Sequence, residues 1–272
     1  MNFFINEIGD WIVGFVLSVV RILVILLFVP LFEFKQVKAV LIKVAISFGI
    51  GLPVYASIIE QLYNRELPST FLSLMILKEV AIGLVIGYVV AIPFWIFRST
   101  GALIDNQRGA LSAGYHNPAS GPDASMLGDL FQKLVVLAML YAGILPELFT
   151  FIYLSHELWP ALDKMPAFQN MAWYEIVSLF NLLIKQFVLY AGPVVLILLL
   201  VEAAFAILGA YSPQLQVYFM AMPAKSLMAL FIVVLYLPYL LQAMEIEAGY
   251  YFDLVALFER IFQPSTDIYR PL

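Results

Sequence analysis

The sequence predicts an all-α membrane protein with about six long apolar helices, and two observations carry that prediction. First, 63% of the 272 residues are hydrophobic, only 12% are charged, and the mean hydropathy is +0.95. Soluble domains are nearer half apolar and a quarter charged. Second, apolar segments of near-spanning length follow one another along most of the chain, with turn and breaker residues at the joints. We therefore expect one membrane domain, residues 1–272, without a soluble appendage.

The six apolar segments can be placed by their lengths and by the breakers between them. In order, they are residues 11–30, 40–59, 71–97, 130–153, 176–208 and 227–241. Residues 245–272 follow the last segment and predict an amphipathic or surface tail, because aromatic side chains like theirs suit a membrane interface. The basic residues at the joints are divided almost evenly between the two sides of the membrane. The positive-inside rule therefore hardly decides the orientation, and it slightly favours both termini outside the cytoplasm.

Two features do not fit a simple bundle of six spans. The fifth segment, 176–208, would be about 50 Å long as a helix, whereas the hydrocarbon core is about 30 Å thick. It must therefore tilt, kink at Pro193 or leave the bilayer. Nearly every segment also holds an ionisable residue, and such residues face protein, water or one another rather than lipid. These residues are Arg21, Lys43, Glu79, Lys133, Lys185 and Glu202.

Composition and motifs exclude several classes of site. The sequence has no cysteine, which rules out disulfides, thiolate metal sites and cysteine nucleophiles. His116 and His156 are isolated from other metal-binding side chains, so we expect them in loops. No hydrolase, zinc or nucleotide-binding motif occurs, so we expect no enzyme, metal or cofactor. The acidic residues gather in the tail, and the net charge is −5, which argues against nucleic acid as a partner.

Glu79, Gly83 and Gly87 are spaced four apart and predict one face of a helix. The two glycines form a G-x-x-x-G pattern, which lets a second helix approach closely. Glycines are common in membrane helices, so the pattern is also compatible with no special contact. For Glu79 we favour an ion-pair or hydrogen-bonding role within this packing, and a proton relay is the alternative.

A polar cluster follows the third apolar segment and leads into a long loop. Asp105, Asn106 and Gln107 begin it, and polar residues at this place must lie in water or in a polar cavity. The residues after them are small, polar or turn-forming and predict a flexible loop rather than a packed element. The loop is either a solvated linker or a lid or plug. Its candidate residues are Arg108, Gly109, Ser112, Gly114, Tyr115, His116, Asn117, Pro118, Gly121 and Pro122.

Glu202 and a turn-rich stretch predict a tight, partly buried hairpin between the last two apolar segments. Pro213, Gln214 and Gln216 form the turn. The two glutamine side chains can hold backbone groups or line a polar opening. An ordinary helical hairpin turn is the alternative.

Two blocks of sequence resemble one known family. They are PFWIFRSTGALIDNQRGA, at residues 93–110, and GPVVLILLLVEAAFAILG, at residues 192–209, which continues into SPQLQVYFMAMPAKS at 212–226. The chain is similar, over nearly its whole length, to the FliR/SctT/SpaR proteins of the export gate of bacterial type III secretion. Flagellar members usually have an asparagine and a glycine where this chain has Gln216 and Ala221, which favours the injectisome branch.

The resemblance implies an architecture that hydropathy does not predict. Such a protein is a single-copy subunit that assembles with several copies of two smaller membrane proteins, the R/P type and the S/Q type. Residues 1–170, including loop 108–126, would be similar to the R/P type, and residues 171–272 to the S/Q-type hairpin plus a tail. Together they would form a helical, dome-like channel. Much of it would stand above the bacterial inner membrane, inside the secretion basal body.

The resemblance also implies roles and partners. Unfolded secreted proteins would pass through the channel, loop 108–126 would plug it at rest, and the 213–216 hairpin would face the cytoplasmic entrance. Further partners would be the U/FlhB-type switch protein, the V/FlhA-type export protein, inner rod or needle proteins, and membrane lipid. Two rivals remain. A secondary transporter of small solutes needs paired broken helices in an internal repeat. An intramembrane enzyme needs a convergent polar site.

Overall fold

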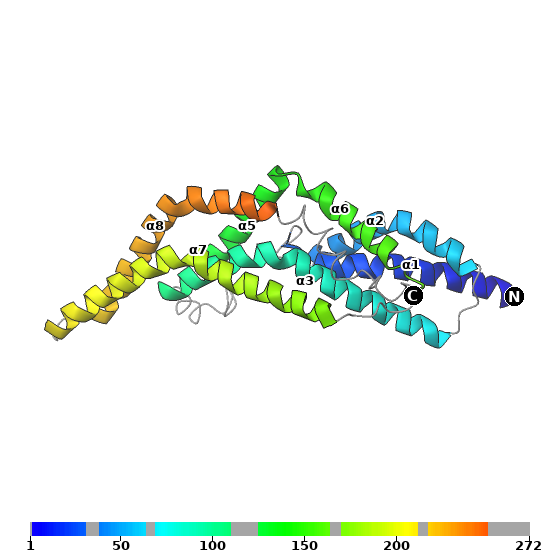
Figure 1. Ribbon diagram of the computed structural model, residues 1–272, viewed down its shortest axis with the longest axis horizontal. Coiled ribbons are helices and arrows are strands. Elements are labelled where there is room, and N and C mark those ends of the chain that lie inside the picture. Colours follow the sequence, from blue (N-terminus) through cyan, green and yellow to red (C-terminus); the bar gives the residue numbers. More distant parts are fainter. Residues whose placement is uncertain are drawn as a thin grey trace, which may run out of the picture. The chain divides into compact units, whose positions relative to one another are not determined.

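The computed structural model describes residues 2–30, 38–63, 69–109, 125–163, 170–211 and 217–249, and its regular elements in these ranges are helices. They are α1 (Asn2–Phe28), α2 (Lys38–Tyr63), α3 (Ser69–Gln107), α5 (Met126–Tyr141), α6 (Ile144–Leu158), α7 (Asn170–Tyr211) and α8 (Val217–Ala248), as Figure 1 shows. Within the described ranges, five helices are long and apolar enough to cross a membrane, or six spans if α5 and α6 count as one. The predicted all-α membrane fold is confirmed.

Helix lengths differ from the predicted segments in informative ways. The fourth segment was expected as one helix, and it is two, because Gly143 adopts a left-handed conformation, with φ of 76°, between α5 and α6. His156 lies in α6, so the prediction that it lies in a loop was wrong. α7 is one helix of 42 residues with Pro193 inside it. α8 continues to Ala248, so the predicted tail begins later than residue 245.

The contacts divide the described residues into two compact units. The first holds residues up to 92 and residues 143–178, and thus α1, α2, the first part of α3, α6 and the start of α7. The second holds residues 93–142 and 179–249, and thus the end of α3, α5, most of α7, and α8. These units do not follow the division at residue 170 that the resemblance implies. That division stays a prediction.

In the first unit, α1 packs against α2, α3 and α6. α2 runs antiparallel to α1: Gly14 faces Ile59 and Leu62, and at the other end Lys43 Nζ lies 3.4 Å from the carbonyl oxygens of Leu27 and Val29. A buried apolar cluster forms where α1, α2 and α3 meet the turn after α6. Its members are Leu17, Val54, Ile58, Leu62, Met75, Ala161 and Leu162.

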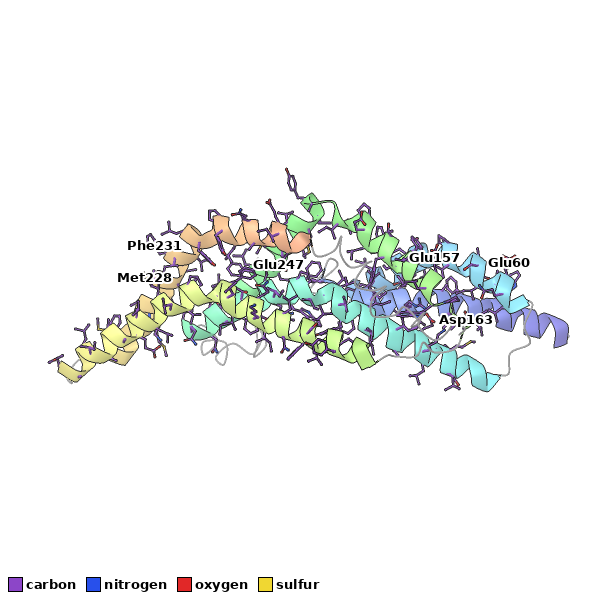
Figure 2. All side chains as sticks on the ribbon, in the orientation of Figure 1. Glu60, Glu157, Asp163, Met228, Phe231 and Glu247 are labelled. Atoms are coloured by element: carbon purple, nitrogen blue, oxygen red, sulfur yellow. The ribbon has the colours of Figure 1, made fainter. Side chains whose placement is uncertain are left out.

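In the second unit, aromatic and hydroxyl side chains join the end of α3 to α7 and α8. The rings of Phe97 and Tyr190 stack with centroids 5.4 Å apart, and the Tyr190 hydroxyl donates to Glu247 Oε1 at 2.8 Å. α5 packs against α8. Apolar side chains such as Met228 and Phe231 are exposed along α8 (Figure 2), which suits a surface covered by lipid or protein.

Candidate functional site: a buried ion-pair cluster and a loop anchor

The charges that the sequence places in apolar segments form a buried cluster in the first unit. Arg21 on α1 and Glu79 on α3 are fully buried and make a bidentate ion pair, with Nε–Oε2 of 2.7 Å and Nη2–Oε1 of 2.9 Å. Lys78 is 6% exposed, and its Nζ lies 3.4 Å from Glu79 Oε1. The pairing keeps the carboxylate from being left alone in an apolar interior, which would cost about 3–5 kcal/mol.

The same cations contact backbone carbonyl groups around the end of α6. Arg21 donates through Nη1 to the Ser155 carbonyl oxygen and through Nη2 to that of Trp159 at 2.8 Å. Lys78 Nζ donates to the carbonyl oxygens of Pro160, Ala161 and Asp163 at 2.9, 2.8 and 2.9 Å. Figure 2 labels Glu157, in the last turn of α6, and Asp163, which follows that helix.

Gly83 and Gly87 lie against α1 in the same unit. A Cβ at Gly83 would lie 2.9 Å from Val24 Cβ and 3.0 Å from the Arg21 carbonyl oxygen. A Cβ at Gly87 would lie 2.7 Å from the Phe28 ring. These separations are shorter than side-chain contacts tolerate, so the two glycines let α3 approach α1 and bring Glu79 to Arg21.

The polar cluster at the end of α3 is organised by Asp105, which is 1% exposed. Arg108 Nε donates to Asp105 Oδ1 at 2.8 Å. On the other side of the loop, the Ser125 hydroxyl and the Leu127 backbone N–H donate to Oδ2 at 2.7 and 2.9 Å. Ser125 is also the N-cap of α5, since its Oγ accepts from the Gly128 N–H at 2.9 Å. One carboxylate therefore joins the residues before segment 110–124 to those after it.

Glycines allow α3 and the start of α5 to meet at this anchor. A Cβ at Gly101 would overlap the backbone of Leu127, and one at Gly128 would lie 2.9 Å from the Arg98 carbonyl oxygen. Gly101, Ser125 and Gly128 are not among the residues predicted from the sequence. A small residue one turn before Asp105, and a serine before an apolar run with Asp129 in its first turn, were the available signals.

A cavity of about 650 Å³ lies beside the anchor in the second unit. Its polar lining includes Asn106, Gln107 and Arg108 from the end of α3. On its other walls, Lys225 of α8 pairs with Glu202 of α7 at 2.9 Å, and the two side chains are 14% and 55% exposed. The pair is thus partly hydrated, and the cavity brings the predicted polar cluster and Glu202 together.

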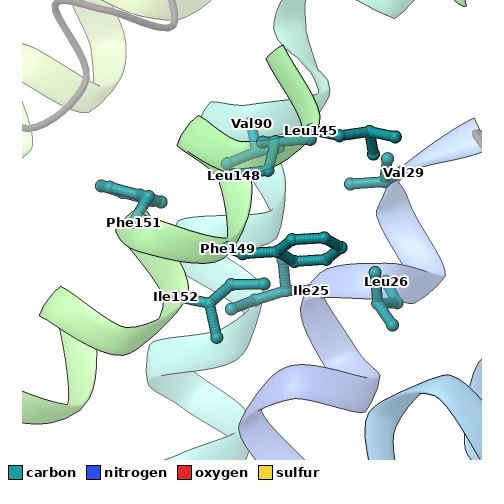
Figure 3. Close-up of a pocket in the computed structure, with 9 residues that line it drawn as sticks. All are labelled: Ile25, Leu26, Val29, Val90, Leu145, Leu148, Phe149, Phe151 and Ile152. Atoms are coloured by element: carbon teal, nitrogen blue, oxygen red, sulfur yellow. The ribbon is translucent and has the colours of Figure 1, made fainter. Parts of the chain in front are cut away.

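An apolar crevice in the first unit is a packing gap and not a ligand site. Figure 3 shows its lining, nine apolar side chains from α1, α3 and α6 that include Ile25, Val90 and Phe149. The interior volume of about 10 Å³ is no larger than one water molecule needs, and the lining offers no polar partner. Within the described residues, no group of three or more metal-binding side chains gathers either.

The remaining predicted residues of the loop and of the hairpin lie outside the described residues. They are Ser112, Gly114, Tyr115, His116, Asn117, Pro118, Gly121 and Pro122 of the loop, and Pro213, Gln214 and Gln216 of the hairpin. Of the predicted loop residues, Arg108 and Gly109 are described, and both line the 650 Å³ cavity.

Comparison with known proteins identifies the family. Residues 12–249 match the model of the family described as "Bacterial export proteins, family 1". The chain belongs to this family. The resemblance to the FliR/SctT/SpaR proteins of type III export is thereby confirmed.

Curated members of the bacterial export family include injectisome and flagellar proteins. The chain is 30% identical to Yop proteins translocation protein T of Yersinia pestis over 79% of its length and 82% of the relative's. It is 33% identical to surface presentation of antigens protein SpaR of Shigella flexneri, over 58% and 60%. To flagellar biosynthetic protein FliR of Bacillus subtilis it is 26% identical, over 81% and 84%. The relatives are components of export apparatuses, and no known enzyme is among these three.

Proposed function

We propose that this chain is a structural, pore-forming subunit of the type III export gate in the bacterial inner membrane. Segment 110–124 would seal the channel at rest. The observation that carries the proposal is the Asp105 anchor, which joins both ends of this segment through Arg108, Ser125 and Leu127. Family membership supports the role in the gate.

A loop closed at its base suits a plug better than a linker. A linker spans the distance between two elements, so its two ends lie apart. Here the two ends of the segment are held together, so the segment is longer than a connection between α3 and α5 requires. Closing the base also confines the loop to one place, and the entropy cost of closure grows slowly with loop length. With little apolar surface of its own, the loop can be displaced by a passing chain at small cost.

The gate needs partners, and the second unit has surface for them. Only 11% of the α7 span Ile176–Tyr211 is buried within the chain. We propose that R/P-type and S/Q-type gate proteins cover part of this surface and lipid covers the rest. The U/FlhB-type and V/FlhA-type proteins would lie near the 213–216 hairpin, and inner rod or needle proteins beyond the channel. The chain would carry out no catalysis, and energy would come from elsewhere. The injectisome branch stays a prediction, because the identities to injectisome relatives, 24–33%, overlap those to flagellar relatives, 22–26%.

A secondary transporter of small solutes is the second candidate, because α5 and α6 resemble one broken span. Transporters of this kind pair two broken helices in corresponding positions of a repeat. Only one such pair is found in the described ranges. The 650 Å³ cavity would be the solute site in this alternative, with Glu202 and Lys225 on its wall.

The deciding experiment removes the loop from the assembled gate. Deleting residues 112–122 should leave protein secretion largely intact and make the inner membrane permeable to ions and small solutes. Asp105→Ala should cause a smaller leak, because it releases the base of the loop. The leak should require coexpression of the gate proteins. Abolished secretion with a tight membrane would make the loop structural, and saturable uptake of one solute would favour the transporter.

A further inference from the structure

α6 ends inside the first unit, where its carbonyl groups cannot all be left to water. The last four carbonyls of an α-helix have no partner within the helix. Just beyond α6, backbone N–H groups supply some partners: Trp159 donates to the Ser155 carbonyl and Asp163 to that of Pro160, each at 3.2 Å. In an apolar layer, each unsatisfied group costs several kcal/mol, so the protein must supply a donor. Residues 161 and 162, just beyond the helix, are 4% and 2% exposed and belong to the apolar cluster with Leu17 and Met75.

We propose that Arg21 and Lys78 are positioning residues that cap this buried helix end and hold the segment 159–163 in place, with Glu79 as their counter-ion. Two cations from two other helices donate to five carbonyl oxygens, that of Ser155 in the last turn of α6 and those of Trp159, Pro160, Ala161 and Asp163 in the segment after it. The cap explains why α1 and α3 carry charges at positions where the sequence is otherwise apolar.

The use of the Lys78 donors separates this role from simple ion pairing. An ammonium group has three N–H donors, and Lys78 directs hydrogen bonds of 2.8–2.9 Å to three backbone carbonyls. Its separation from Glu79 is longer, at 3.4 Å. If Lys78 served Glu79 alone, the shorter contacts would be to the carboxylate.

The sign of the charges agrees with a cap. Arg21 and Lys78 are both cations, and their carboxylate neighbours are Glu79, which is buried, and Asp163, which also acts on Lys78. The C-terminal end of a helix carries about half a negative charge, and cations are favourable there. The two cations thus lie where the backbone dipoles at the end of α6 favour positive charge.

The test uses a cysteine reporter, because the chain contains no native cysteine. Ala161→Cys places a thiol in the capped segment, and its reaction with a water-soluble maleimide reports whether that segment leaves its packed position. The full-length chain is labelled in the membrane complex in which it purifies. Glu157→Cys, on the exposed side of α6, provides the rate of an open thiol. Ala191 is fully buried in the second unit, so labelling of Ala191→Cys shows whether a variant also disturbs the packing of that unit.

Two variants of similar length distinguish donation from charge. Lys78→Gln keeps N–H donors and loses the charge, whereas Lys78→Met loses both. The cap predicts that Lys78→Met raises the labelling rate of Ala161→Cys by about tenfold or more, since hydrogen bonds from a charged donor are lost. Lys78→Gln should raise it much less, and the labelling of Ala191→Cys should not change. Equal rates for the two Lys78 variants would overturn the cap.

An exchange of charges provides a second test. Arg21→Met should expose Ala161→Cys, and the double variant Arg21→Glu with Glu79→Arg should not restore protection. A carboxylate at position 21 cannot donate to the carbonyls of Ser155 and Trp159, although the ion pair itself is rebuilt. Protection restored by the exchange would show that the pair alone matters. If Arg21 variants do not accumulate, the Lys78 variants decide.

The cap does not depend on the proposed function. Labelling is read on the chain itself, whatever proteins purify with it. If no gate proteins purify with the chain, this result counts against the export-gate role. The labelling rate of Ala161→Cys still tests the cap. Rapid labelling of Ala161→Cys in the otherwise unchanged chain would overturn the cap and leave the gate role untouched.

Discussion

At the scale of single residues, backbone proximity in the second unit depends on glycine. Gly101 of α3 lies directly against the backbone of Leu127, and there is no side chain between them that might move aside. The contact brings Asp105 within hydrogen-bonding distance of Ser125 and Leu127. Gly192, in α7, has nothing within 4 Å of where its Cβ would be.

Gly101→Ala should therefore destabilise the protein, whereas Gly192→Ala should not. Overpacking a close contact costs about 1–3 kcal/mol, and at Gly101 the obstructing atoms belong to the backbone. An alanine in place of a helical glycine normally stabilises by about 0.5–1 kcal/mol, which is the expectation at Gly192. The measurement is the midpoint of thermal unfolding of the purified complex in detergent. Equal midpoints for the two variants would contradict the close contact.

At the scale of elements, α3 contributes to both units and carries a different contact in each. Its first part meets α1 through Gly83 and Gly87, which brings Glu79 to Arg21. Its last turn carries Asp105, the anchor of the loop. The helix is 39 residues long, with Pro93 inside it at the boundary between the units.

Gly83→Leu or Gly87→Leu should push α3 away from α1 and reduce both assembly and secretion. The expected cost is about 1–3 kcal/mol for each change. Glu79→Gln should be milder than Glu79→Leu, because the amide still accepts hydrogen bonds from Arg21. Gly49→Leu on α2 is the matched control, since Gly49 is exposed and has no neighbour within 4 Å of its Cβ position. Full secretion from both α3 variants would exclude this packing face.

At the scale of the whole molecule, the apolar helices differ in how much of them the chain itself buries: 67% of the α3 span and 44% of the α1 span, but only 11% of the α7 span. In the first unit, Arg21, Lys78 and Glu79 pair with one another. In the second unit, α7 and α8 expose long apolar faces and the partly hydrated pair of Glu202 and Lys225. The need for partners is therefore greatest around α7.

Expressed alone, the chain should be degraded or should aggregate, whereas coexpression with the two small gate proteins should produce one detergent-stable complex. The physical reason is the exposed apolar surface of α7 and α8 together with a polar pair that lipid does not solvate well. Accumulation in the membrane and size-exclusion chromatography measure the difference. A well-behaved monomer that ignores both gate proteins would contradict it.

The class and the family of the protein could be predicted without any tertiary contact. Hydropathy over windows of a helix's length depends only on which residues are near one another along the chain, so the apolar helices and the all-α fold could be predicted. The block at 93–110 is a contiguous motif that points to the family without any knowledge of tertiary contacts, and the family match over residues 12–249 agrees with it. The charges at Arg21 and Glu79 were visible as anomalies in apolar segments.

The contacts of those charges could not be predicted from the sequence. Arg21 and Glu79 are 58 residues apart, and Lys78 meets carbonyl groups more than 80 residues away, so no local pattern links them. The break at Gly143 was missed because a single positive φ leaves almost no trace in hydropathy. Asp105 was predicted only as part of a polar helix end. Its role as an anchor depends on Ser125 and Leu127, which approach it because the chain returns there.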